Sequence, residues 1–212
     1  MKDIKLIIFD LDGTLVNAYQ AITSSFNYTM KKLNYPQQSP EVIRRVVGWG
    51  DEALLKPFVI RKDLKKAVLF YRKHHRKALI SGSRLMPKAK MVLSGLKNKG
   101  YLLAIASNRP TQFSLILLRR LKIDKYFDYV LCADKLKRAK PYPDILRKII
   151  RELSVKPRET IYVGDMAVDA RAGRSARIKT VIVTTGSRIT ADLKKERPFR
   201  IIPGLSLDSL GL

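Results

Sequence analysis

The chain has 212 residues, of which 43 are Lys or Arg and 18 are Asp or Glu, so its formal net charge at pH 7 is +25. Hydrophobic residues make up 46% of the sequence, which excludes a disordered tail or a low-complexity fibre. No apolar run approaches the roughly 20 residues that cross a bilayer. The first apolar run is short and meets Asp10 and Asp12 at once, unlike a secretory signal. With Cys132 as the single cysteine, we expect a soluble cytoplasmic protein without disulfides.

The positive charge is spread along the chain rather than gathered in a tail. A basic surface attracts nucleic acids, and it also attracts small phosphorylated metabolites. Over residues 61–79, basic and apolar side chains fall on opposite faces of a predicted helix. This pattern is typical of a solvated surface helix, and a docking face for a polyanion is the alternative. His74 and His75 fall near the apolar side, where a packed imidazole is expected rather than a ligand or base.

Short apolar runs that end in polar residues predict buried β-strands. The runs are residues 4–9, 102–106, 161–163 and 181–183. Amphipathic helices are predicted between them, at about 87–98, 111–121, 143–153 and 168–176. This alternation predicts an α/β fold with a Rossmann-like parallel sheet covered by helices on both faces. In such sheets, ligands bind at the carboxyl edge.

One interval breaks this rhythm. A strand–helix–strand unit needs about 30 residues, whereas about 85 separate Thr14 from the run that starts at Leu102. Residues 16–82 are predicted to be helical throughout. We therefore expect a small all-helical cap domain at 16–82, inserted after the first strand above the carboxyl edge of the sheet. Residues 1–15 and 83–212 would form the core domain.

Acidic residues at two strand ends indicate phosphoryl transfer. Asp10 and Asp12 leave the first strand two residues apart, so one carboxylate can attack phosphorus while the other handles a proton. Asp165 and Asp169 follow the 161–163 run, and hard oxygen ligands of this kind suit Mg²⁺ beside a phosphate. The alternative for this second pair is a helix cap and a surface charge.

Two further sites support this interpretation. Ser107 and Asn108 end the second core strand, where a hydroxyl and backbone N–H groups can hold phosphoryl oxygens, although Ser-Asn is also ordinary turn chemistry. Lys140 stands before a Pro-Tyr-Pro-Asp segment whose prolines fix the loop at the start of a helix. A rigidly presented ammonium can neutralise the aspartates and the transferred phosphoryl group.

These segments resemble the motifs of a known family. They read FDLDGTL at 9–15, IASN at 105–108, KPYPD at 140–144 and VGDMAVD at 163–169. With all of them in this order, the chain resembles the haloacid dehalogenase-like hydrolase superfamily, and within it the phosphoglycolate phosphatase group with a helical cap. The resemblance covers essentially the whole chain, including the insertion.

The resemblance implies a Mg²⁺-dependent phosphatase that hydrolyses a small phosphorylated metabolite through an aspartyl-phosphate. Asp10 would be the nucleophile and Asp12 the general acid/base, while Lys140 would orient the nucleophile. An aspartate at position 12 argues for phosphate chemistry, because the dehalogenases of the family lack the acid/base there. The phosphoryl group would be bound by Ser107 and Asn108, and we expect Gly13 and Thr14 among the substrate-binding residues.

The resemblance also implies a metal site and a cap loop. Mg²⁺ would be held by Asp10, the backbone carbonyl of Asp12 and Asp165, with Asp169 supporting the metal site or pairing with Lys140. The segment VVGWGDEALL at 46–55 resembles the loop that phosphoglycolate phosphatases hold over the active site. The expected substrate contacts there come from Gly48 and Gly50, which allow close approach, and from Arg45 or Trp49. Packing in the cap core is the alternative for Trp49.

Several alternatives stay open at this stage. A phosphomutase, a pyrophosphatase, a nucleotidase or a phosphonatase with a cap lysine could use the same core. A nucleic-acid-binding protein could keep the core as a scaffold, although we expect its basic surface to bind polyanions only nonspecifically. The substrate itself is not readable, and either a monomer or a homodimer is compatible with the sequence.

Overall fold

The core of the protein is a parallel β-sheet, and the computed structural model describes residues 3–186 and 191–212. The strands are β1 (Leu6–Phe9), β4 (Leu102–Ser107), β5 (Tyr129–Cys132), β6 (Thr160–Gly164), β7 (Lys179–Val183) and β8 (Arg200–Ile202). Their order across the sheet is β5-β4-β1-β6-β7-β8, and every neighbouring pair is parallel. The predicted α/β class is therefore confirmed. The two edge strands, β5 and β8, were not predicted, because each is partly exposed and its apolar run is short.

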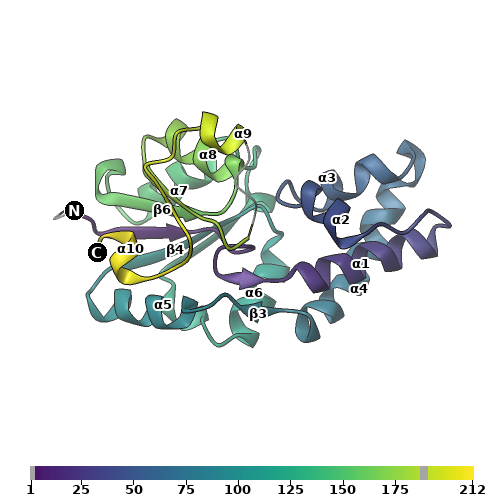
Figure 1. Ribbon diagram of the computed structural model, residues 1–212, viewed down its shortest axis with the longest axis horizontal. Helices are drawn as coiled ribbons and strands as arrows, with labels where there is room; N and C mark the ends of the chain where they lie inside the picture. The colour runs from purple at the N-terminus through teal and green to yellow at the C-terminus, as the bar shows by residue number, and fades with distance from the viewer. Residues whose placement is uncertain (1–2, 187–190) are drawn as a thin grey trace.

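Helices cover both faces of the sheet (Figure 1). One face carries α5 (Ala89–Asn98), α6 (Thr111–Arg120) and α10 (Leu207–Leu210), and the other carries α7 (Asp144–Glu152), α8 (Ala167–Ala176) and α9 (Ala191–Lys195). Alternate residues of β1 serve the two layers: Ile7 and Phe9 pack with the α5–α6 layer, and Leu6 and Ile8 with the α7–α8 layer. All four are completely buried, which is why this strand is apolar throughout.

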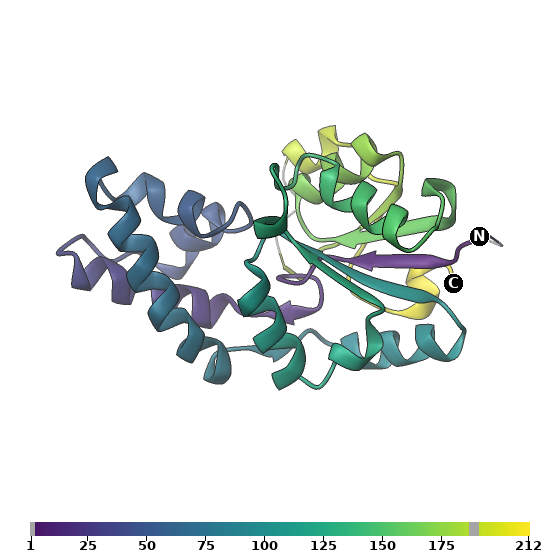
Figure 2. The same cartoon turned by 180° about the vertical axis from the view of Figure 1, so that it is seen from behind.

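The insertion after β1 forms a separate group of helices at one end of the molecule, and the chain termini lie at the other end (Figures 1 and 2). Its helices are α1 (Tyr19–Lys32), α2 (Pro40–Val46), α3 (Asp51–Leu55) and α4 (Leu64–Ser81). Short 3₁₀ turns at Lys56–Phe58 and Arg61–Asp63 precede α4. The expected helical insertion is thus confirmed. None of the described helices is long and apolar enough to span a membrane.

The insertion does not consist of helices alone. A two-residue strand, β2 (Val16–Asn17), pairs antiparallel with β3 (Arg84–Leu85). The prediction that residues 16–82 are helical throughout was therefore wrong at its start, because two residues are too few for a periodic signal. We propose that this β2–β3 pair is where the chain enters and leaves the cap, close to the boundaries at 16 and 82.

The basic face of α4 is a solvated surface. Its lysines and arginines, including those of the preceding turn, are all exposed, and Arg72 forms an ion pair with Asp51 at 2.8 Å. The opposite side of the helix packs inward, where His75 is completely buried. This is the packed imidazole that the helical periodicity predicts.

Candidate active site

The order of the strands brings the polar residues of the motifs together. The central strands β4, β1 and β6 are neighbours, and parallel strands end at the same edge of a sheet. Ser107 therefore ends β4 beside Asp10, which follows β1, and Asp165, which follows β6. The hydrogen bond from the Asp10 amide to the carbonyl of Val163, at 2.8 Å, extends the ladder as far as the first carboxylate.

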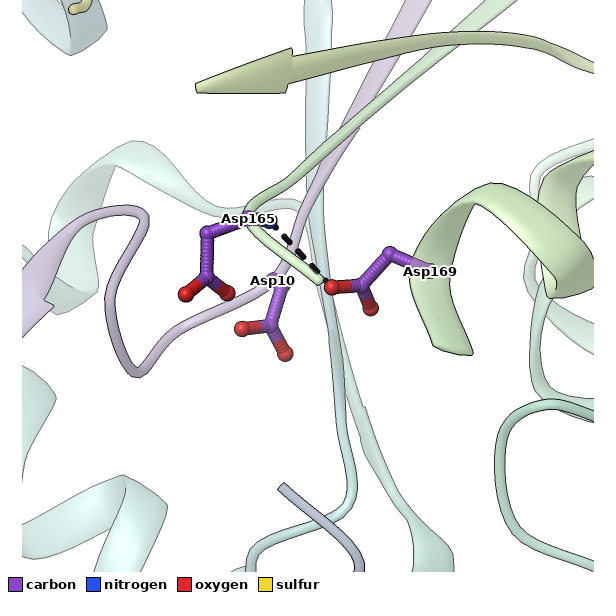
Figure 3. Close-up of side chains that lie close together, drawn as sticks. All are labelled: Asp10, Asp165 and Asp169. Atoms are coloured by element: carbon purple, nitrogen blue, oxygen red, sulfur yellow. Dashed lines mark hydrogen bonds between the residues drawn. The ribbon is translucent and has the colours of Figure 1, made fainter. Parts of the chain in front are cut away.

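Three aspartates form a buried cluster at this edge. Carboxylate oxygens of Asp10, Asp165 and Asp169 lie within 4.8 Å of one another, and the three residues are 6%, 1% and 1% exposed. Figure 3 shows the carboxylates of Asp10 and Asp165 pointing the same way, with Asp169 reaching toward them from the first turn of α8. Carboxylate oxygens gathered in this way suit a hard divalent cation.

Asp169 connects the cluster to its surroundings through both oxygens. Its Oδ2 accepts hydrogen bonds from the backbone amides of Asp165 at 3.2 Å and Met166 at 3.0 Å, which secures the start of α8. Its Oδ1 accepts from the Tyr162 hydroxyl at 2.6 Å and from Lys140 at 2.8 Å. The alternative of a surface charge is wrong because Asp169 is buried, whereas the capping contact and the pairing with Lys140 are both present.

Lys140 brings a cation into the cluster. Its Nζ lies 2.5 Å from Asp10 Oδ1, 2.8 Å from Asp169 Oδ1 and 2.9 Å from the carbonyl oxygen of Ala106. Burial lowers the pKa of Lys140, but the two aspartates together raise it above its ordinary value. The ammonium is therefore charged, and it fixes one oxygen of the Asp10 carboxylate.

Asn108 holds the Lys140 loop and the cap loop in place. Its Oδ1 accepts from the Lys140 amide at 2.9 Å, and its Nδ2 donates to the carbonyl oxygens of Lys140 at 3.0 Å and Gly48 at 2.9 Å. These bonds occupy the carboxamide. Contact between residue 108 and a phosphoryl group would then come from its backbone rather than from its side chain.

Asp12 is paired with an arginine that follows the second motif. Arg109 donates from Nε to Asp12 Oδ2 and from Nη2 to Asp12 Oδ1, both at 2.7 Å. The third arm, Nη1, lies 2.7 Å from Nε2 of His75 in α4. Arg109 and His75 are both buried, so the acid/base candidate of the core is linked to the cap by a desolvated chain of side chains.

A cavity of about 60 Å³ lies between the core and the cap. Its lining includes Asp10, Asp12, Ser107, Asn108, Lys140 and Asp169 from the core, and Gly48 and Gly50 from the cap loop. Gly48 approaches the core closely, since a Cβ there would lie 2.5 Å from Met166 Sδ, whereas a Cβ on Gly50 would make an ordinary contact with the carbonyl oxygen of Asn108 at 3.7 Å.

Two of the expected cap contacts are not brought to this cavity. Neither Arg45 nor Trp49 is among its lining residues, and both are exposed, Trp49 by 48%. That either faces the substrate therefore stays a prediction, and Trp49, with its exposed side chain, does not belong to the buried core of the cap. Gly48 and Gly50 line the cavity, while the side chain of Trp49 between them is exposed to solvent.

Gly13 and Thr14 are not among the residues that line the cavity. Gly13 has φ +84°, and a Cβ there would lie 2.2 Å from Asp165 Oδ2. A Cβ on Gly186 would meet the same oxygen at 2.2 Å. The two glycines thus make the space in which the Asp165 carboxylate sits, and Thr14 is completely buried beside them.

Comparison with known proteins decides the family. Residues 7–183 match the model of the haloacid dehalogenase-like hydrolases. The chain belongs to this family. A phosphoglycolate phosphatase of Aquifex aeolicus is 31% identical over 182 residues, covering 86% of this chain and 85% of the relative. One from Haemophilus influenzae is 30% identical over 205 residues and 92% of each chain. The crystal structure of a predicted phosphoglycolate phosphatase from Haemophilus somnus has a TM-score of 0.89 at 29% identity over 96% of each chain.

The charges in the site of this hydrolase fit a divalent cation. Four carboxylates face two cationic side chains, so two negative charges are uncompensated when all are ionised; the groups are Asp10, Asp12, Asp165, Asp169, Lys140 and Arg109. Burial raises the pKa of Asp10 to about 7, against the effect of Lys140, and burial with the neighbouring Asp169 also raises the pKa of Asp165. A dication would offset the surplus negative charge and so lower both pKa values.

Sequence reasoning missed Arg109 and His75. Arg109 directly follows the Ser-Asn pair of the second motif, which was the available signal, but it is one basic residue among 43. His75 carried no signal beyond its place on the apolar side of a helix. Their contact joins residues 34 apart in the chain, and the Arg109–Asp12 pair joins residues 97 apart.

Proposed function

We propose that this haloacid dehalogenase-like hydrolase is a Mg²⁺-dependent phosphatase that cleaves a small, phosphoglycolate-like phosphomonoester through an aspartyl-phosphate on Asp10. The observation that carries the proposal is that Asp10, Asp12 and Lys140 line one cavity, and that Asp10 also belongs to the buried carboxylate cluster with Asp165. The phosphoglycolate phosphatases among its relatives support the same chemistry.

Asp10 is the nucleophile in this proposal. Lys140 contacts its Oδ1, so we assign the attack on phosphorus to Oδ2. The attacking carboxylate must be ionised, and the ammonium at 2.5 Å favours that form against the effect of burial. In the first step the Oδ2–P bond forms, and the bond from phosphorus to the leaving oxygen breaks.

Asp12 is the general acid/base. Its side chain is 19% exposed and lies in the cavity, where it can give a proton to the leaving oxygen. In the second step it takes a proton from the water that attacks phosphorus, and the electron pair of the broken bond returns to Asp10. The hydroxyl of Ser107 lines the same cavity and is assigned to the phosphoryl oxygens.

Mg²⁺ would be held by the carboxylates of Asp10 and Asp165 together with the backbone carbonyl of Asp12. The ion would supply positive charge that offsets the charge of the phosphoryl oxygens. Asp169 is assigned a supporting role, because its two oxygens already contact Lys140, Tyr162 and backbone amides.

The size of the cavity supports a small leaving group. Sites for drug-sized ligands enclose about 300–1,000 Å³, whereas this cavity has about 60 Å³ with the cap loop bonded to the core through Asn108. Its cap side is largely apolar and includes Ile22, Leu54 and Tyr71. A leaving group of a few heavy atoms fits within this space, which favours a small substrate over a nucleotide.

The decisive test compares Asp10→Asn with the wild type on phosphoglycolate and on p-nitrophenyl phosphate, with and without Mg²⁺. Loss of the nucleophile should lower turnover by more than about a thousandfold on both substrates. Asp124→Asn, at an exposed aspartate outside the lining of the cavity, is the matched control and should keep full turnover. Near-native turnover by Asp10→Asn would contradict the mechanism, and faster release of phosphate from pyrophosphate or nucleotides would contradict the substrate class.

A further inference from the structure

A directed chain of hydrogen bonds runs from the cap to the acid/base. Its geometry assigns each donor. Arg109 is always protonated, so its Nη1 donates to Nε2 of His75. The ring proton of His75 is therefore on Nδ1, which lies 3.0 Å from the hydroxyl oxygen of Ser25. Ser25 accepts this bond and donates its own proton to the carbonyl of Ala21 at 2.7 Å.

The imidazole of His75 is held in position by its packing. Its ring stacks on Tyr71 with centroids 4.8 Å apart, and it meets the edge of Phe113 in α6 at 5.3 Å. His75 is completely buried. Burial and the neighbouring Arg109 lower its pKa to about 2, so the ring is neutral and Nε2 stays an acceptor. The acceptor is thus presented to the guanidinium at a fixed point.

We propose that His75 and Arg109 are positioning residues for proton transfer: His75, carried by the cap, fixes the guanidinium of Arg109, and Arg109 fixes the carboxylate of Asp12. A planar guanidinium grips a carboxylate with two bonds only when its plane is correctly turned, and the contact with His75 sets that plane. The proposal rests on the acid/base role of Asp12 in the proposed function.

The step most affected is the hydrolysis of the aspartyl-phosphate. Here Asp12 acts as the base, and the two bonds from Arg109 hold its carboxylate in a fixed place. In this step the oxygen of water bonds to phosphorus, the proton of water passes to Asp12, and the P–O bond to Asp10 breaks with its electron pair returning to Asp10. Displacing the base by about 1 Å can slow such a step about a hundredfold.

The test uses p-nitrophenyl phosphate with Mg²⁺, because its leaving group needs little protonation. For this substrate kcat/KM reports formation of the aspartyl-phosphate, and kcat reports its hydrolysis once that step is slow. The main variant is His75→Phe, which keeps an aromatic ring between Tyr71 and Phe113 and removes the acceptor. We expect kcat to fall about 10- to 100-fold, kcat/KM to change less than about threefold, and phosphoenzyme to accumulate in rapid-quench experiments.

Three further variants make the result specific. His75→Gln offers an amide oxygen to Arg109 and should recover most of kcat. Arg109→Lys keeps the charge but cannot form the two-bond grip, so it should reproduce the profile of His75→Phe and serves as the test if His75→Phe does not fold. His74→Phe is the matched control: His74 contacts the same Ser25 hydroxyl at 3.1 Å and stacks on Tyr28, but the imidazole that meets Arg109 is that of His75. It should behave like the wild type.

Four results would overturn the proposal. They are an equal fall of kcat and kcat/KM in His75→Phe and Arg109→Lys, no change in either, a His74→Phe variant that matches His75→Phe, and a His75→Gln variant that recovers nothing. Each of these presupposes a wild type whose turnover depends on Asp10. If the wild type shows no such turnover, the proposed function itself fails. This result can be told apart from a failure of the positioning role of His75 and Arg109.

Discussion

Acidification should destabilise this protein through His75, and the size of the effect can be calculated from the structure. The pKa of His75 is about 2 in the folded state, against about 6.5 in the unfolded chain. Between these two pKa values the unfolded chain therefore binds a proton at His75 and the folded protein does not. The stability linked to this group is complete above pH 6.5 and is lost as the pH falls toward 2.

The loss between pH 7.5 and pH 5.0 is about 2 kcal/mol, because each pH unit below 6.5 costs up to about 1.4 kcal/mol. In this window the result hardly depends on the folded-state pKa, which lies well below 5. His75 is 0% exposed, so solvent screening does not reduce the effect. Asp10, with its raised pKa of about 7, titrates in the same window with the opposite sign.

The assay is urea unfolding of the wild type and His75→Phe at pH 7.5, 6.5 and 5.0, without Mg²⁺. Contributions from Asp10 and all other groups are common to both proteins and cancel in the comparison. The free energy of unfolding of the wild type should fall by about 2 kcal/mol more than that of the variant across this range. Parallel pH profiles for the two proteins would show that His75 binds a proton without unfolding, and would refute the reasoning.

Two further predictions concern the acidic cluster. Gly13→Ala should destabilise the protein by about 2–4 kcal/mol, because its Cβ would meet Asp165 Oδ2 at 2.2 Å; Gly100→Ala, with nearly the same φ of +82° and no atom within 4 Å of the added carbon, should cost only about 1 kcal/mol. Equal losses in urea unfolding would mean that backbone strain alone decides both. Mg²⁺ should raise the melting temperature of the wild type and of Asp124→Asn, and Asp165→Asn should abolish the rise, since the ion stabilises only a fold that binds it. A rise that persists in Asp165→Asn would place the ion elsewhere.

The central strands were readable because burial on both faces demands an unbroken apolar run. Leu6–Phe9 in β1 shows this directly, since all its residues are buried. The edge strand Arg200–Ile202 was missed because two of its three residues are exposed, which leaves no such run. The two-residue strands at the base of the cap carry no periodic signal because they are too short.

The candidate acidic residues were also readable, because each follows a strand whose end the chain marks with polar residues and turns. Asp10 and Asp165 could be named in this way, but their meeting depends on β1 and β6 being neighbours in the sheet. The order of strands follows from how the whole chain packs, and no local pattern encodes it.

The amino-acid pattern alone was enough for the fold class, the helical insertion and the residues of the acidic cluster, because these follow from short-range hydrophobic periodicity and from motifs a few residues long. The partners of Asp12 were decided only by folding. Arg109 comes from the core and His75 from the cap, and no local sequence pattern around either residue indicates that the two are in contact. A hydrogen bond needs two groups within about 3 Å, and for groups so far apart along the chain only the packing of one domain against the other provides that distance.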